Sequence, residues 1–296
     1  MNRRELLRTT PILIASSLRS AWPLSAVPLQ RRVESRLRTA ICAYSFRTKL
    51  QSKTLSYADL IHMAVEQEID GLDLTVYWFP GTGSEFLLPL KRLAYQMAVE
   101  IYSISIRTNL CQSTPDSRAK ELSEIRKWVD VAQKLGAGHI RIFGGEVPEG
   151  TSEDQAVAWA VEVLGRAADI AGEKGVVLGL ENHGGITTKS EQVIQILKRV
   201  DSPWVGISLD TGNFSRDPYA EIEACAPYAV NVQVKTRVLD NQGNLVPADW
   251  GRILRALSKA GYKGYLALEY EGEEDPETAV PPLTKRLRVL AKKYST

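Results

Sequence analysis

The chain has few of the side chains that build thiolate metal centres, disulfide frameworks and membrane spans. Its 296 residues include only three cysteines, Cys42, Cys111 and Cys225, which lie far apart and show no CxxC spacing. This spacing excludes a thiolate zinc site and a closed disulfide framework, and it predicts three buried small side chains. No stretch approaches the ~18 to 20 apolar residues that a membrane span needs, so we expect a soluble protein.

An excess of charge of one sign is also lacking. Lys and Arg total 37 against 35 Asp and Glu, a net charge of +2, which gives no reason to expect a nucleic-acid partner. Glycine-rich phosphate loops are missing as well, because FGGEVPEG and GTGSE match neither GxGxxG nor a P-loop. Their absence disfavours a doubly wound nucleotide-binding sheet, which is the alternative α/β architecture for a chain of this length.

The first thirty residues differ in kind from the rest. Arg3 and Arg4 precede a short apolar stretch and then small residues, which predicts a twin-arginine signal segment over 1–30 and an exported, periplasmic protein. Arg19 interrupts the apolar stretch, and Leu24 is a poor match for a cleavage site after residue 26. The alternative is therefore a basic amphipathic tail on a cytoplasmic enzyme.

From about residue 38, short apolar runs alternate with longer amphipathic stretches, the rhythm of βα units. Ser152, Ser190 and Asp249 are expected to cap helix N-termini. Eight such units predict one domain over residues 31–296, a (β/α)8 TIM barrel of the α/β class. The expected strands are 39–46, 71–77, 101–107, 139–144, 176–181, 205–210, 230–236 and 265–270.

Four of the expected strands end in a polar residue that can ligate a divalent cation: Glu181, Asp210, Gln233 and Glu269. Side chains alternate across a strand, and the outer face of a barrel packs on helices, so these polar groups should face the interior near the catalytic mouth. Carboxylates buried together without a cation would be costly and would raise one another's pKa values. A divalent ion resolves both problems.

The segments LENHGG, SLDTGN, VQVKT and LALEYEG resemble, in this order, the ends of strands five to eight of the xylose-isomerase-like barrel superfamily of sugar isomerases and epimerases. The resemblance covers roughly residues 38–290 and implies a metal held by Glu181, Asp210, residue 233 and Glu269. The chain has Gln233 where histidine is usual, and the resulting all-oxygen set favours Mn²⁺ or Mg²⁺ over Zn²⁺. The alternative is that Gln233 only hydrogen-bonds beside a weak or empty site.

The same resemblance implies a metal-dependent sugar isomerase or epimerase in which Glu181 and Glu269 move a proton on opposite sides of an enediolate. Two alternatives stay open: a keto-sugar lyase or hydratase on the same site, and a non-catalytic sugar-binding barrel. Only three histidines exist in the chain, too few for the trinuclear zinc site of the nuclease branch of this superfamily. No compact Arg/Lys cluster lies at the late loops, so we expect a neutral sugar or polyol rather than a phosphate, and homo-oligomerisation is left open.

Five residues near strand ends are predicted to contact the substrate: His183, Asn213, Lys235, Arg141 and Trp78. Asn213 stands where epimerases of the superfamily often place a histidine. For Lys235 the competing interpretation is a salt bridge to one of the site acids, and for Arg141 a structural ion pair. For Trp78 it is simple packing, and the same alternative applies to Phe143 and Tyr44, which also lie near early strand ends and could stack on a sugar.

Overall fold

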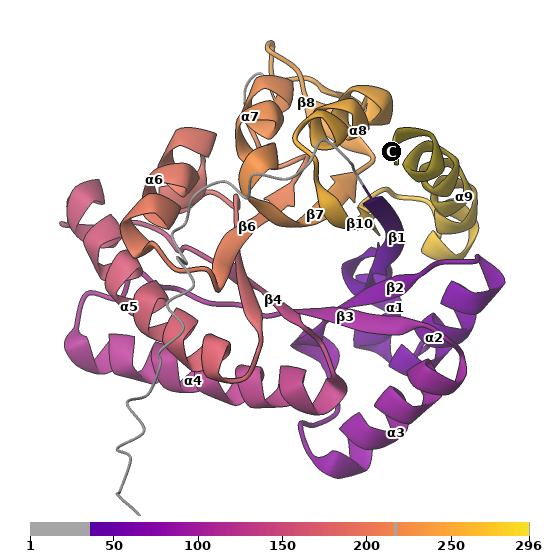
Figure 1. The fold of residues 1–296 in the computed structure, drawn as a ribbon, viewed down its shortest axis with the longest axis horizontal. Helices are drawn as coiled ribbons and strands as arrows, with labels where there is room; N and C mark the ends of the chain where they lie inside the picture. Colours follow the sequence, from indigo (N-terminus) through magenta and orange to yellow (C-terminus); the bar gives the residue numbers. More distant parts are fainter. Residues whose placement is uncertain (1–35, 216–217, 296) are drawn as a thin grey trace, which may run out of the picture.

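The computed structural model describes residues 36–215 and 218–295, and in it eight parallel strands close into a barrel. The strands follow one another around the ring in chain order, and β1 closes it by pairing with β10 (Figure 1). The fold predicted from the sequence is confirmed; the expected signal segment lies outside the described residues. The barrel strands are β1 (Arg36–Cys42), β2 (Gly71–Thr75), β3 (Glu100–Ser105), β4 (His139–Phe143), β5 (Val177–Glu181), β6 (Val205–Asp210), β7 (Ala229–Lys235) and β10 (Lys263–Glu269).

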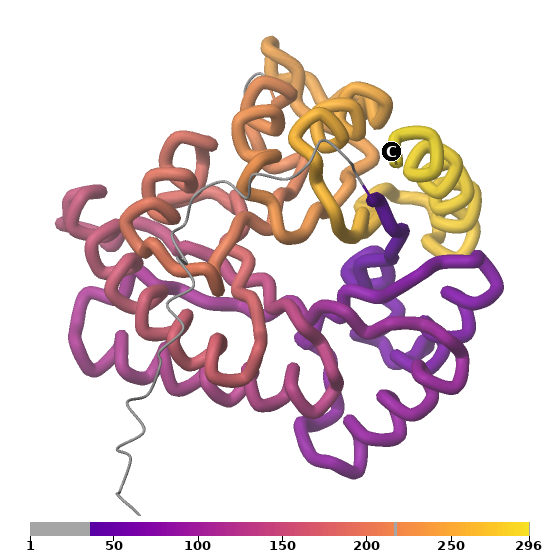
Figure 2. Tube along the Cα trace, viewed as in Figure 1, coloured from indigo at the N-terminus to yellow at the C-terminus, as the bar shows by residue number. Residues whose placement is uncertain are grey.

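Helices surround the barrel, and Figure 2 shows the chain winding around it so that the last helix, α9, returns beside β1. Among the described residues, no helix is long and apolar enough to cross a membrane. The helices are α1 (Arg47–Ser52), α2 (Tyr57–Glu66), α3 (Ser84–Gln96), α4 (Pro115–Leu135), α5 (Glu153–Glu173), α6 (Ser190–Val200), α7 (Pro218–Cys225), α8 (Trp250–Lys259) and α9 (Pro276–Tyr294). Short 3₁₀ turns are η1 (Ala43–Phe46), η2 (Val76–Trp78), η3 (Gly185–Thr187) and η4 (Ala226–Tyr228).

Side-chain caps fix several helix starts. Ser152 and Asp249 accept from backbone N–H groups two or three residues into α5 and α8, as predicted. The prediction for Ser190 is wrong: Lys189 holds the N-cap position of α6, and Ser190 is the first helical residue. The backbone N–H of Ser190 instead donates to Glu221 Oε2 at 2.6 Å, so a carboxylate from α7 satisfies this free amide.

The first two strands are shorter than predicted. The runs 39–46 and 71–77 turn into η1 and η2 at the mouth of the barrel instead of continuing as strand. Ser45 holds the first of these turns, because its hydroxyl donates to Leu268 O and accepts from Tyr270 N. Aromatic residues in both runs favour strand by propensity, and in the first run the contacts of Ser45 override that preference.

A two-stranded hairpin, β8 (Arg237–Leu239) and β9 (Leu245–Pro247), follows β7 and was not predicted. Asp240 orders its turn, since its Oδ1 accepts from the N–H groups of Gln242 and Asn244. Gly243 adopts a φ of +82° there, a conformation that glycine allows. Strands of three residues are too short for an alternation pattern, so the hairpin gives no clear sequence signal.

The barrel separates an apolar outside from a small, largely polar inside. The outward side chains join the helices in one large core, whereas Ala40, Cys42, Tyr102 and Ala267 form a separate small cluster. All three cysteines are free and buried, as predicted.

Polar groups at the N-terminal end of the barrel are paired with one another. Arg38 donates to Glu100 at 2.8 Å and lies over the Tyr265 ring, 4.6 Å from its centroid. Tyr265 also donates to Glu100 and stacks on Tyr102 with 3.8 Å between ring centroids. His139 is buried beside Ser103, with 2.8 Å between Nδ1 and the hydroxyl oxygen. These contacts close the end of the barrel opposite the predicted site.

Candidate active site

A polar cavity of about 380 Å³, here called the mouth pocket, opens at the carboxyl ends of the strands. Its walls include both predicted acid/base residues, Glu181 on β5 and Glu269 on β10. Four of the five predicted substrate-contacting residues line it as well: Arg141, His183, Asn213 and Lys235. Side chains from five or more separate strands and loops therefore meet at one site, as a barrel mouth allows.

Glu181 is buried on one side of the mouth pocket and is held by two neighbours. Arg141 Nε lies 2.9 Å from Glu181 Oε2, and Asn213 Nδ2 donates to Glu181 Oε1 at 3.2 Å. Arg141 itself is fixed, because it donates to Tyr77 Oη and to Ile106 O. Burial raises the pKa of Glu181 well above its usual value, although the Arg141 charge acts in the opposite direction.

Glu269 is buried on the other side and meets a different environment. The Lys235 ammonium pairs with Glu269 Oε1 and with Glu271, and the Cys42 thiol donates to Glu269 Oε2 at 3.1 Å. Burial acts to raise the pKa of Glu269, but the adjacent Lys235 charge and these hydrogen bonds outweigh it and lower the pKa. Two carboxyl groups in one pocket thus differ in their affinity for a proton.

Asp210 and Gln233 lie beneath these acids and are opposite each other in the ladder between β6 and β7. The backbone of Asp210 is locked by Asn182, whose side-chain amide both donates to and accepts from it. Asp210 Oδ2 and Gln233 Oε1 are buried and have no hydrogen-bond partner. Burial raises the pKa of Asp210 to about 7, with the Lys235 charge offsetting part of that effect.

Lys235 supplies a positive charge among the predicted metal ligands. Its Nζ lies 3.4 Å from Asp210 Oδ2 and also pairs with Glu269 and Glu271. Lys235 therefore forms the salt bridge to the site acids that was the alternative to its predicted contact with substrate. Arg141 likewise forms an ion pair with Glu181, which was the alternative to its predicted contact with substrate. Within residues 36–215 and 218–295, no group of three or more His, Cys, Asp and Glu side chains is arranged to hold a metal ion. The metal ligand set therefore stays a prediction.

The aromatic residues divide between two places. Phe143 and Tyr44 line the mouth pocket, and Phe143 packs on His183 with 4.1 Å between ring centroids. Trp78 does not line it; this residue stacks on Tyr44 at 6.0 Å and faces a cavity on the outside of the barrel. Trp78 is thus separated from the mouth pocket by Tyr44 and could affect a ligand there only by positioning the Tyr44 ring.

Three residues of the mouth pocket were not predicted from the sequence: Tyr77, Arg107 and Glu271. Glu271 had a readable signal, because it lies two residues after Glu269 in LEYEG, on the same side of an extended segment. Arg107 follows β3 as the other site residues follow their strands, and its guanidinium stacks over Tyr77 at 4.2 Å. Tyr77 lies in η2, which the sequence presented as strand.

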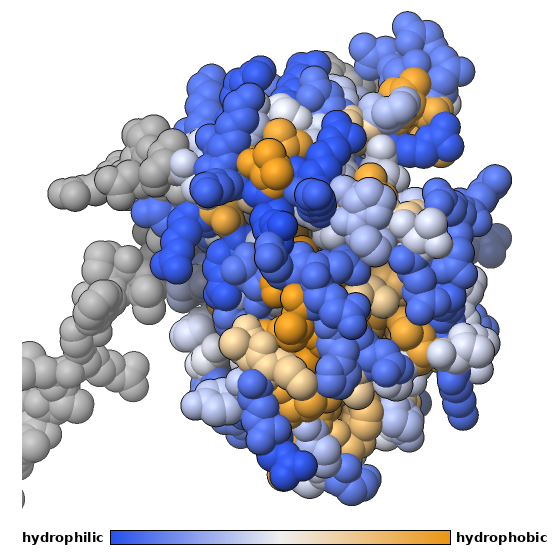
Figure 3. Space-filling view, turned by 90° about the vertical axis from the view of Figure 1, so that its right-hand side faces the viewer, coloured by the Kyte–Doolittle hydropathy of each residue, from blue (hydrophilic) through white to orange (hydrophobic). Residues whose placement is uncertain are grey.

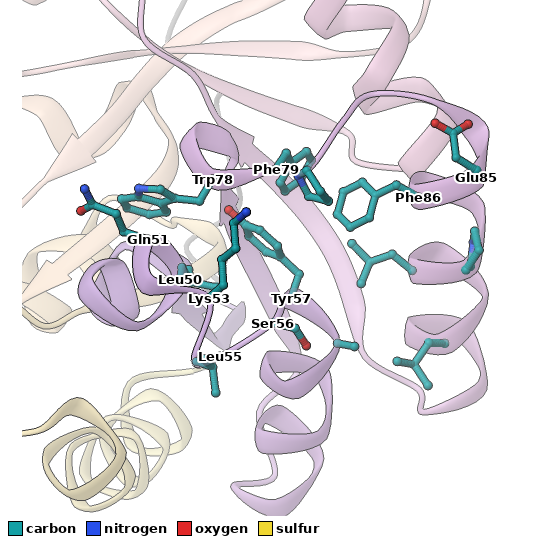
Figure 4. Close-up of a pocket in the computed structure, with 15 residues that line it drawn as sticks. Leu50, Gln51, Lys53, Leu55, Ser56, Tyr57, Trp78, Phe79, Glu85 and Phe86 are labelled. Carbon is teal, nitrogen blue, oxygen red and sulfur yellow. The ribbon is translucent and has the colours of Figure 1, made fainter.

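The outside cavity, here called the side cavity, has about 710 Å³ and lies between α1, η2 and α3 (Figure 4). Its walls are mostly apolar, with Phe79 and Phe86 near its centre, and Glu85 lies at its far edge. Figure 3 looks onto the side of the barrel that carries α2, α3 and α9, where apolar surface gathers in the lower half. No pair of buried acids faces the side cavity, so we place the chemistry at the smaller mouth pocket.

The family of the chain is settled by a family model, the xylose isomerase-like TIM barrel, which matches residues 64–290. The chain belongs to this family. The sequence resemblance is thereby confirmed at the level of the family. No curated protein matches the chain.

Solved structures share the fold at low sequence identity. A D-psicose 3-epimerase with D-tagatose from Clostridium cellulolyticum H10 is 17% identical, with a TM-score of 0.69, over 87% of this chain and 98% of that one. The IOLI protein with a binding zinc atom is 16% identical, with a TM-score of 0.70, over 88% and 99%. The probable 3-DHS dehydratase AsbF from Bacillus anthracis is 17% identical, with a TM-score of 0.64, over 86% and 98%. At these identities the likeness shows a shared fold.

Proposed function

We propose that the protein is a sugar isomerase or epimerase that moves a proton at a carbon next to a carbonyl group. Glu181 and Glu269 are the acid/base pair, and a neutral keto-sugar or polyol is the substrate. The family supports this proposal in outline, and two solved structures with the same fold are named as a 3-epimerase and a dehydratase. Both reaction types begin with removal of such a proton.

The observation that carries the proposal is the pair of buried carboxyl groups on two sides of one polar pocket. Each is held in place by a positively charged side chain and by a second hydrogen-bond donor. These are Arg141 and Asn213 for Glu181, and Lys235 and Cys42 for Glu269. Proton transfer on both faces of a planar intermediate needs two such groups within reach of the substrate. Buried carboxylates can also accept hydrogen bonds from sugar hydroxyl groups, so the solvent-exchange test below separates a catalyst from a binding protein.

The side chains themselves suggest what each does. A sugar in the mouth pocket meets Glu181 from β5 and Glu269 from β10, while Lys235 and Arg141 stabilise negative charge that develops on the carbonyl oxygen. His183 and Asn213 are placed to orient hydroxyl groups. The pocket is sunk in the barrel mouth, which limits the access of water to the intermediate.

A divalent cation fits the chemistry of the donor set. The buried oxygens Asp210 Oδ2 and Gln233 Oε1 have no hydrogen-bond partner, and together with Glu181 and Glu269 they would form an all-oxygen set for Mn²⁺ or Mg²⁺. When bound, such an ion supplies a Lewis acid that polarises the substrate carbonyl. Lys235 is the side chain that competes with the ion for Asp210 and Glu269.

The test is solvent exchange. The protein, loaded with Mn²⁺, is incubated in D₂O with a panel of neutral keto-sugars, and deuterium at the carbon beside the carbonyl is followed by mass spectrometry and NMR. We expect incorporation together with an epimeric or isomeric product, and none with the double variant Glu181→Gln, Glu269→Gln. An elimination product would indicate a lyase instead, and absence of exchange across the panel would favour a binding protein.

A further inference from the structure

The hairpin β8–β9 adds a wall to the catalytic mouth. It follows β7 after a single intervening residue, Thr236, where a regular βα unit would pass straight into its helix. Arg237 fixes the two short strands to each other by donating to Leu245 O at 2.7 Å. Ala248 N donates to Thr236 O, and the Trp250 indole donates to Lys235 O at 2.8 Å, so both ends of the insertion are attached to the barrel.

Behind this wall lies a cavity of about 560 Å³, here called the outer lobe. The outer lobe and the mouth pocket are both lined by Asn213, Lys235, Glu269 and Glu271, so the two cavities adjoin at these four residues. Each lobe is within the range of about 300 to 1,000 Å³ that small-molecule sites occupy. A ligand that fills the mouth pocket therefore has room to extend past Glu269.

The outer lobe has the chemistry of a site for a neutral polyhydroxyl group. Thr236 brings a hydroxyl, Arg237 and Glu273 bring opposite charges at the rim, and Glu271 is already paired with Lys235. Two positive side chains, Lys235 and Arg237, face three glutamates in the lining of the lobe, so the lobe disfavours a phosphate or a carboxylate. Leu245, which is exposed and apolar, offers a surface for the C–H face of a sugar ring.

We propose that the substrate is a glycoside of at least two sugar units, with one ring in the mouth pocket and the second in the outer lobe. This inference rests on the proposed function and adds the size of the substrate to it. Glu269 and Lys235, which line both lobes, lie beside the junction of the two rings.

The experiment measures binding by calorimetry with the full protein. The probes are maltose, cellobiose, lactose and sucrose, each beside its component monosaccharides. Glu273→Trp places a bulky ring in the outer lobe at an exposed position, so folding is unaffected. Glu274→Trp is the matched control, because the neighbouring Glu274 is equally exposed but lines neither lobe.

We expect at least one disaccharide to bind about tenfold or more tighter than its monosaccharides, since the second ring adds contacts. Glu273→Trp should abolish that advantage and leave monosaccharide binding unchanged, whereas Glu274→Trp should behave as the wild type. Equal binding of both sizes, or a disaccharide advantage that survives Glu273→Trp, would overturn the two-lobe proposal and leave the proposed function intact. Failure of every carbohydrate to bind would likewise overturn the two-lobe proposal, whereas the proposed function stands or falls with the solvent-exchange test on keto-sugars.

Discussion

Both ends of this barrel carry charged and polar side chains, which are partly exposed at the N-terminal end and buried at the mouth. At the N-terminal end, Arg38, Glu100 and Tyr265 contact one another, and the Asp70 carboxylate accepts from both the backbone and the hydroxyl of Thr39. At the C-terminal end, the buried oxygen Gln233 Oε1 has no hydrogen-bond partner, and the buried oxygen Asp210 Oδ2 has only the Lys235 ammonium nearby, at 3.4 Å. The closed end leaves one buried nitrogen, His139 Nε2, without a partner, whereas the mouth leaves acceptor oxygens of two neighbouring side chains without a hydrogen bond.

In the proposed function, the closed end is structural and the mouth is the end that reacts. An unsatisfied buried polar atom costs roughly 1 to 3 kcal/mol, so a fold keeps such atoms only where another requirement outweighs stability. Substitutions at the mouth should accordingly change chemistry more than folding, and substitutions at the closed end should do the reverse. Each prediction below tests one side of this comparison.

The largest effect is expected from the two acids of the mouth. Glu181→Gln and Glu269→Gln keep the shape of the side chain but remove the basic carboxylate, so turnover should fall by roughly 10² to 10⁴. Steady-state kinetics on the substrate found by solvent exchange measure this, with thermal unfolding as the check on folding. Near-normal turnover in either variant would show that His183 or Lys235 carries the proton instead.

At the closed end, Tyr102→Ala should cost stability. Tyr102 stacks on Tyr265 and donates to Asn231 Oδ1 at 2.9 Å inside the barrel, so removing the ring leaves a cavity and an unpaired amide. We expect the free energy of unfolding to fall by about 3 to 5 kcal/mol, measured by urea denaturation. Turnover per folded molecule should be unchanged, because Tyr102 does not line the mouth pocket; a large loss of turnover would contradict the division between the two ends.

Metal binding distinguishes the carboxylates of the mouth from a buried carboxylate elsewhere. Asp210→Asn should weaken Mn²⁺ binding, which calorimetry measures, by more than roughly 10- to 100-fold. That range is the usual effect of losing a residue that only hydrogen-bonds to a metal ligand, and Asp210 is predicted to be a ligand itself. Asp73→Asn is the control, since Asp73 is fully buried on β2 and has an unpartnered oxygen of its own but is not among the predicted ligands. Gln233→His should shift the preference toward Zn²⁺ or Co²⁺, because imidazole is a softer donor. Indifference to both Asp210→Asn and Gln233→His would remove the metal from the site.

The smallest effect concerns pH and the closed end. Burial, with a contribution from Arg141, lowers the pKa of His139 to about 3, against about 6.5 in an unfolded chain. Between these values the unfolded chain binds a proton that the folded protein does not, so stability is full above pH 6.5 and falls as the pH drops toward 3. The loss is about 1.4 kcal/mol per pH unit.

His139→Gln removes this titration and keeps a polar group beside Ser103. Urea unfolding of both proteins at pH 7, 6 and 5 gives the difference in slope, in which the contributions of the other acids cancel. Parallel curves would mean that His139 is already neutral in the unfolded chain or is accessible to protons in the folded one.

The fold and the mouth acids could be predicted because two local signals agree. Glu181, Asp210 and Glu269 each terminate a short apolar run, and alternation places each of them on the inner face of its strand. In a closed barrel the carboxyl ends of all strands meet at one mouth, so the fold alone predicts that these acids lie close together. Cys42, in contrast, was predicted only to be a small buried residue. Nothing in the sequence indicates its hydrogen bond to Glu269, which lies 227 positions later.

What could not be predicted depends on contacts between distant segments. The run AYSF has strand propensity and became a 3₁₀ turn because Ser45 bonds to β10, which lies more than 200 residues later. The pairing of Lys235 with Asp210, Glu269 and Glu271 was weighed as an alternative, but only the folded chain shows that three acids share one ammonium. Local propensity carries no information on such long-range pairs.

The internal pairing of charges at the mouth also has a kinetic consequence. Because Lys235 and Arg141 are matched by acids within the pocket itself, little net field extends from it into solvent. A ligand is then captured by ordinary diffusion rather than drawn in by electrostatic attraction. The association rate of the ligand would then stay nearly constant between dilute buffer and seawater-like salt. Capture of the ligand would therefore be equally fast in compartments of very different ionic strength.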